Sequence, residues 1–94
     1  MRLYNLIEFL NNLNEDTELF LRIHGQDYPL SKITITADEC LLYPGKQAMT
    51  KKRMYKMIKN LHRHTSYIWM MNGKEKIEAY GIQISIENYS ATLM

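Results

Sequence analysis

The sequence contains few of the residues that cross-link or stiffen a small protein. Its 94 residues include one cysteine, Cys40, two prolines and no valine. A single cysteine excludes a disulfide within the chain. It is typical either of a protein from a reducing compartment or of a buried, small apolar side chain. The fold must therefore depend mainly on apolar burial.

Long apolar runs are also missing. Near the N-terminus, apolar side chains are interleaved with Asn5, Glu8 and Asn11, so no continuous segment resembles the hydrophobic region of a signal peptide. No stretch reaches the roughly 18 consecutive apolar residues that a membrane-spanning helix needs. From these two absences we expect a cytoplasmic protein without a membrane partner.

The composition is that of a globular protein. Hydrophobic residues make up 46% of the chain and charged residues 23%, unlike the composition of disordered sequences. A chain of this length has material for one hydrophobic core, which predicts a single domain over residues 1–94. The abundance of Ile, Asn, Lys, Tyr and Met indicates an AT-rich genome, such as that of a low-GC bacterium, a phage or a mobile element.

Apolar residues recur at helical spacing in two segments. The first pattern predicts an amphipathic helix over residues 2–13, and the second predicts a helix over about 50–63 that starts from Thr50 as its N-cap. We expect Met54 and Met57 of the second helix to pack in the core. The first stripe consists of Leu3, Leu6, Ile7, Leu10 and Leu13, and the second of Met54, Met57, Ile58 and Leu61.

Elsewhere apolar residues alternate with a period of two, which is typical of strands. Pro29 lacks an N–H and is expected at a strand start or an edge, and Gly81 is expected to bend or break the last strand. Short connections favour antiparallel pairing. The predicted fold class is α+β: a small single domain in the order α-β-β-β-α-β-β, with a mostly antiparallel sheet and two helices packed on one face. The predicted strands span residues 17–24, 28–36, 40–43, 67–71 and 74–87.

No common catalytic or metal-binding motif is complete. The Gly-Lys pair at 45–46 lacks the earlier glycine and the following Ser or Thr of a phosphate-binding loop. His62 and His64 could hold a metal only with further converging ligands, such as His24 or Cys40. Cys40 has no evident third group to orient His24 as a base. We therefore predict a protein that is not an enzyme and that needs no cofactor or metal.

Charge is distributed unevenly along the chain. Residues 1–40 have a net charge of −4, residues 41–74 contain eight basic and no acidic residues, and residues 75–94 have a net charge of −2. Most of the basic block falls on the second predicted helix. At 100° per residue, four basic side chains form a row opposite the apolar stripe, with Tyr55 and His62 beside it. The row consists of Lys52, Lys56, Lys59 and Arg63.

The basic row has two interpretations. As a functional surface, it would neutralise nucleic-acid phosphates, or it would dock on an acidic protein that handles nucleic acid, for example as an inhibitor. Tyr55 and His62 would then stack on bases or fill pockets. As an ordinary solvent-exposed helix face, it would have no partner. Our leading hypothesis is a non-enzymatic interaction module that binds an anionic macromolecule through this row.

The alternative hypothesis uses the sheet. The strand over residues 67–71 is apolar on both sides, with Tyr67, Trp69 and Met71 on one and Ile68 and Met70 on the other. If the helices cover only one face of the sheet, the other face exposes an apolar patch, which usually marks a protein contact. The protein would then be a homo-oligomeric accessory protein, in the simplest case a homodimer, and the basic helix would merely be solvated.

Overall fold

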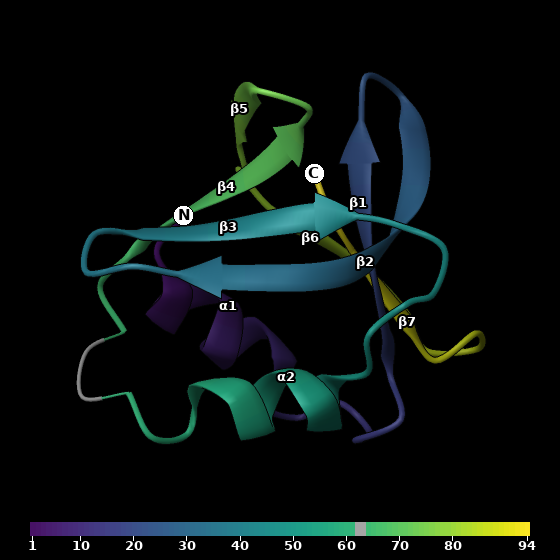
Figure 1. Cartoon of the computed structure of the whole chain (residues 1–94). Helices are drawn as coiled ribbons and strands as arrows, with labels where there is room; N and C mark the ends of the chain where they lie inside the picture. Colours follow the sequence, from purple (N-terminus) through teal and green to yellow (C-terminus); the bar gives the residue numbers. More distant parts are fainter. Residues whose placement is uncertain (62–63) are drawn as a thin grey trace.

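The computed structural model describes residues 1–61 and 64–94, and Figure 1 shows their arrangement. Both helices lie on the same side of a strongly twisted sheet. The predicted α+β class is therefore confirmed. The helices are α1 (Leu3–Leu10) and α2 (Lys51–Ile58), and the strands are β1 (Glu18–Ile23), β2 (Gln26–Ile35), β3 (Glu39–Pro44), β4 (Tyr67–Asn72), β5 (Glu75–Glu78), β6 (Ile82–Ser85) and β7 (Ser90–Leu93).

The seven strands of the described residues form one sheet in the order β5-β4-β3-β2-β1-β7-β6. Four of the six neighbouring pairs are antiparallel, which confirms the mostly antiparallel prediction. The β3–β4 and β1–β7 pairs are parallel. A parallel pair needs a long crossover, and α2 lies in the connection between β3 and β4. The two edges of the sheet are β5 and β6.

Strand β2 changes its partner halfway along its length. Its first four residues pair with β1, and the residues from Leu30 onward pair with β3, with a shift of register between Leu30 and Lys32. Pro29 is the fourth residue of β2, and β2 lies between β1 and β3, so the expectation of a strand start or an edge is wrong. The carbonyl oxygen of Pro29, on the side of β2 that faces β3, accepts a hydrogen bond from the N–H of Gly45. The ladder between β2 and β3 begins only at the next residue, Leu30. The missing N–H of Pro29 therefore interrupts no ladder bond.

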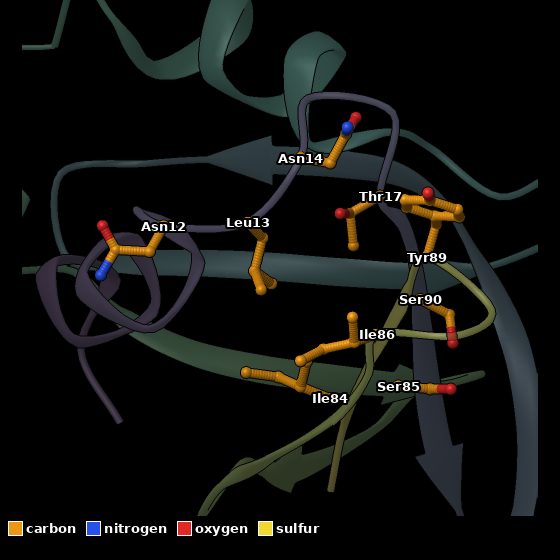
Figure 2. Close-up of a pocket in the computed structure, with 9 residues that line it drawn as sticks. All are labelled: Asn12, Leu13, Asn14, Thr17, Ile84, Ser85, Ile86, Tyr89 and Ser90. Atoms are coloured by element: carbon orange, nitrogen blue, oxygen red, sulfur yellow. The ribbon is translucent and has the colours of Figure 1, made fainter.

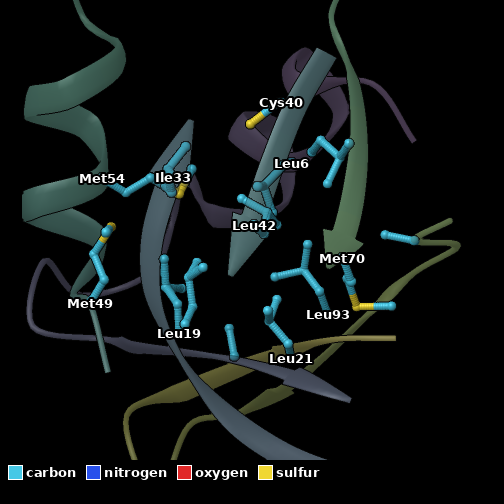
Figure 3. Close-up of a cluster of buried hydrophobic side chains, with 14 of the residues drawn as sticks. Leu6, Leu19, Leu21, Ile33, Cys40, Leu42, Met49, Met54, Met70 and Leu93 are labelled. Atoms are coloured by element: carbon cyan, nitrogen blue, oxygen red, sulfur yellow. The ribbon is translucent and has the colours of Figure 1, made fainter. Parts of the chain in front are cut away.

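The core lies between the sheet and the helices, and Figure 3 shows part of it. The alternation predicted for β1 is confirmed, because Leu19, Leu21 and Ile23 are buried while Phe20 and Arg22 are partly exposed. Strand β3, the neighbour of β2, and both helices complete the interior. Its side chains that are less than 2% exposed belong to Leu3, Leu6, Leu10, Leu19, Leu21, Leu30, Cys40, Leu42, Met54, Ile68, Met70, Ala79, Ala91 and Leu93.

Both helices are shorter than predicted. α1 ends at Leu10 instead of residue 13, and α2 ends at Ile58 instead of 63; residues 62–63 lie outside the described residues. Met54 is fully buried as expected, whereas Met57 is 43% exposed, so its placement in the core is wrong. Met57 lies about 200° from Tyr55 around the helix axis. Tyr55 faces α1, and the buried side chains of α2 are Lys51, Met54 and Ile58, so Met57 lies on the opposite flank of the helix, beside the buried stripe.

The C-terminal segment departs most from the alternating pattern. Gly81 separates β5 from β6, as expected, but β6 stops at Ser85 instead of continuing to Glu87. The chain then turns and returns as β7, a strand that the alternation did not predict. β7 lies between β6 and β1, where Ala91 and Leu93 are fully buried.

Candidate anion-binding site

Helix α2 begins with the predicted cap. The Oγ1 of Thr50 accepts a hydrogen bond from the N–H of Arg53 at 3.2 Å, which satisfies one of the free N–H groups of the first turn. The buried residues of α2 are Lys51, Met54 and Ile58, at the spacing i, i+3, i+7. A lysine thus occupies a position on the buried stripe.

Lys51 is only 6% exposed, which is rare for a lysine. Its Nζ donates to the carbonyl oxygens of Asn11 at 3.1 Å and of Leu13 at 2.7 Å. Both carbonyls follow the last residue of α1, a region where helix carbonyls run out of backbone partners. Lys51 therefore ties the start of α2 to the end of α1.

Tyr55 makes a second tie between the helices. Its hydroxyl donates to the carbonyl oxygen of Ile7 at 3.0 Å, and the Nζ of Lys51 lies 5.0 Å from the centre of its ring. This distance is suited to a cation–π interaction. Burial raises the pKa of the Tyr55 phenol, which keeps the hydroxyl protonated as a donor.

Along this flank of α2 opens a depression of 390 Å³, which we call the lysine hollow. Its volume is in the range of small-ligand pockets. The loop that joins α1 to β1 forms the opposite wall, and it contributes one carboxylate. The lining residues are Glu15, Lys51, Lys52, Tyr55, Lys56 and Lys59.

Positive charge prevails in the lysine hollow. Lys52, Lys56 and Lys59 are exposed, and Glu15 is the one acidic residue of the lining. A hollow lined by four lysines and one carboxylate favours an anionic occupant. In the part of the chain that the structure describes, no ion pair within 4.0 Å involves a lysine of α2; the pairs are Arg22–Asp27, His24–Glu75 and Lys76–Glu39.

The structure brings together four of the six residues expected to bind a partner. Three of them are the lysines of the row, Lys52, Lys56 and Lys59, and the fourth is Tyr55. Arg63 and His62 lie outside the described residues. Sequence reasoning missed Lys51 and Glu15 as lining residues. Lys51 could have been found from its spacing to Met54 and Ile58, whereas Glu15 reaches the hollow only through the packing of its loop.

The cysteine and histidines show no nucleophilic or metal-binding arrangement among the described residues. Cys40 is 1% exposed, and burial raises the pKa of its thiol to about 12, which leaves almost no thiolate at neutral pH. The Nε2 of His24 lies 3.1 Å from an Oε1 of Glu75, at the tips of two hairpins. In residues 1–61 and 64–94, no three His, Cys, Asp or Glu side chains are grouped to hold a metal ion.

Cationic side chains cover part of the outer face of β4. The guanidinium of Arg2 lies 4.0 Å from the ring centre of Tyr67, and the Nζ of Lys76 lies 5.9 Å from that of Trp69. Trp69 is partly buried and Met71 is buried. The alternative function through an apolar face around Trp69 stays a prediction, and the most exposed apolar side chains lie elsewhere, at Tyr80 and Ile86.

Comparison of the chain with protein-family models, with curated proteins and with solved structures gives no match. Neither helix in the described part of the chain has the length and apolar character that crossing a membrane requires.

Proposed function

We propose that this protein is a non-enzymatic interaction module that docks the lysine hollow on a nucleic-acid backbone. The observation that supports the proposal is the convergence of four lysines on one hollow, against the single carboxylate of Glu15. Contact with phosphates would release the counterions condensed on the nucleic acid, and this release provides affinity without a catalytic group. An acidic protein surface is the competing partner.

The chemistry of the hollow favours the backbone over the bases. Lys52, Lys56 and Lys59 carry point charges, whereas base edges are read mostly by Arg, Asn and Gln side chains with paired donors and acceptors. Tyr55 lines the hollow, but its hydroxyl already donates a hydrogen bond to the carbonyl oxygen of Ile7. We therefore expect binding that depends strongly on salt and little on nucleotide sequence.

The first test is fluorescence anisotropy with labelled duplex and single-stranded oligonucleotides at several salt concentrations. Three phosphate contacts on a duplex predict a log–log slope of about −2.7, and a fourth contact from Arg63 would make it about −3.6. Two duplexes of unrelated sequence should give the same affinity. Absence of binding at low salt would exclude nucleic acid and leave the acidic protein surface as the partner to test.

Charge-reversal variants locate the contact. The double variant K56E/K59E should lower the affinity at about 50 mM salt by at least tenfold and flatten the salt slope. The matched control K32E/K74E changes the net charge equally, but its two lysines lie on β2 and in the β4–β5 turn. An equal loss in both double variants would contradict a contact at the lysine hollow.

Removing the carboxylate should have the opposite effect. Glu15 is exposed and lines the hollow, so Glu15→Gln is expected to tighten binding, while Glu78→Gln, which changes the same charge on β5, leaves affinity within about twofold. Unchanged binding in Glu15→Gln would place the nucleic acid on another surface.

A further inference from the structure

The two edges of the sheet are built differently. Three of the four residues of β5 are charged, and Lys76 is paired with Glu39 of β3. Such charges protect an edge from pairing with another chain. β6 has the sequence Ile-Gln-Ile-Ser, without a charge or a proline. Within residues 1–61 and 64–94, β6 pairs with β7 alone, so its outer row of backbone N–H and C=O groups is open to a further strand.

Apolar side chains accompany this open edge. Ile84 is 40% exposed, and Ile86, just beyond the strand, is 79% exposed. Figure 2 shows both side chains beside Leu13 and below the ring of Tyr89. These residues line a hollow of 160 Å³ that contains no charged residue. Tyr89, which is 56% exposed, has a φ of 48°, a conformation that costs energy for an aromatic residue.

We infer that β6 pairs with β6 of a second copy of this chain, antiparallel and in a register centred on Ile84. The backbone edge already dictates that the occupant is an extended strand. In this register Ile84 lies opposite Ile84 of the second copy, and Ile82 lies opposite Ile86 of the second copy. Every exposed isoleucine of one protomer then contacts an isoleucine of its partner, which is the kind of cross-strand pair that stabilises a sheet.

The charges also favour a second copy. Pairing across a two-fold axis places the residue on the axis opposite its own copy and every other residue opposite a near neighbour of its own strand, so like charges near the axis repel. The register on β6 brings Gln83 opposite Ser85 and involves no charge. The corresponding self-pairing of β5 would bring Glu75 opposite Glu78, which is unfavourable. Of the two edges, β6 is therefore the one compatible with self-association.

Sedimentation velocity of the full chain tests the inference. Because the strand is short, we expect a reversible dimer at concentrations on the order of 100 μM, in the range of small interfaces. Ile84→Lys should stay monomeric at the same concentrations, whereas Glu75→Lys, the same new side chain on the other edge, should dimerise like the unmodified protein. A monomer at every concentration, or association that survives Ile84→Lys, would overturn the inference.

A cross-linking variant tests the register even if Ile84→Lys folds poorly. In an antiparallel pair the Cα atoms of directly opposed residues are about 4.5–5.5 Å apart, within reach of a disulfide. Ile84→Cys should therefore form a covalent dimer under mild oxidation at least tenfold faster than Glu75→Cys. Equal rates would contradict the register. The variant K56E/K59E should dimerise normally, which separates this surface from the lysine hollow.

Discussion

The Nζ of Lys51 lies 2.7 Å from the carbonyl oxygen of Leu13, almost hidden from solvent. This contact has two consequences. It satisfies a carbonyl beyond the end of α1, and it holds the loop after α1 against α2. The same loop contributes Glu15 to the lysine hollow and Leu13 to the hollow beside β6. One buried ammonium group thus positions a segment that both proposed contact surfaces share.

Removal of this ammonium group should destabilise the fold. Lys51→Met keeps the length of the side chain but leaves the carbonyls of Asn11 and Leu13 without their donor, and we expect a loss of about 2 kcal/mol. Lys52→Met, next to it on the exposed side, should change stability by less than about 0.5 kcal/mol. Urea unfolding provides both values. Equal midpoints for the two variants would show that Lys51 has no special role.

The two methionines of α2 offer a matched comparison of burial. Met54 is fully buried and Met57 is 43% exposed, three residues later on the same helix. Met54→Ala should therefore cost about 2–5 kcal/mol, and Met57→Ala less than about 1 kcal/mol. Thermal unfolding followed by circular dichroism measures the difference. A larger loss for Met57→Ala would mean that the helix is rotated relative to this structure.

Gly45 lies against Ser31, where the register of β2 shifts, and this close approach should not tolerate a side chain. A Cβ at Gly45 would lie 2.5 Å from the Cβ of Ser31, so Gly45→Ala should cost about 1–3 kcal/mol. Gly81→Ala meets no atom within 4 Å and serves as the control. In the double variant S31G/G45A, removal of the opposing Cβ should restore part of the stability. Chemical denaturation of the four proteins decides between these outcomes.

The buried thiol predicts both reactivity and pH dependence. Burial raises the pKa of Cys40 from 9.0 to about 12, so a thiol reagent at pH 8 should modify the native protein far more slowly than the protein in urea. Between about pH 9 and 12 the unfolded chain loses this proton while the native protein keeps it. Cys40 therefore stabilises the fold fully below pH 9, and its contribution falls by at most about 1.4 kcal/mol per pH unit above it.

Comparison with Cys40→Ala isolates this effect from the titration of tyrosines and lysines. The melting temperature of the unmodified protein should fall more steeply above pH 9 than that of the variant. Parallel curves, or rapid modification of the native thiol, would mean that Cys40 is accessible to solvent.

Local sequence patterns predicted the strands and helices whose apolar side chains repeat at a regular spacing and pack in the core. The period of two in β1 and the cap at Thr50 depend only on neighbours along the chain, and both are confirmed. The basic row of α2 was also predictable, because three of its lysines share a helix face whatever surrounds it. The presence of a carboxylate beside these lysines was not predictable, because Glu15 belongs to a loop more than 30 residues earlier in the chain.

Short-range periodicity specifies the α+β class, the amphipathic helices and the basic face of α2, because it sets which side chains share a face. Contacts between distant segments set what covers each face. Lys51 is buried, with its ammonium group donating to two carbonyl oxygens after the end of α1, whereas Met57, about 120° away around the helix, is exposed. β7 lies between β1 and β6, so β6 forms the edge of the sheet. These outcomes depend on contacts between segments far apart in the chain, which no local pattern records.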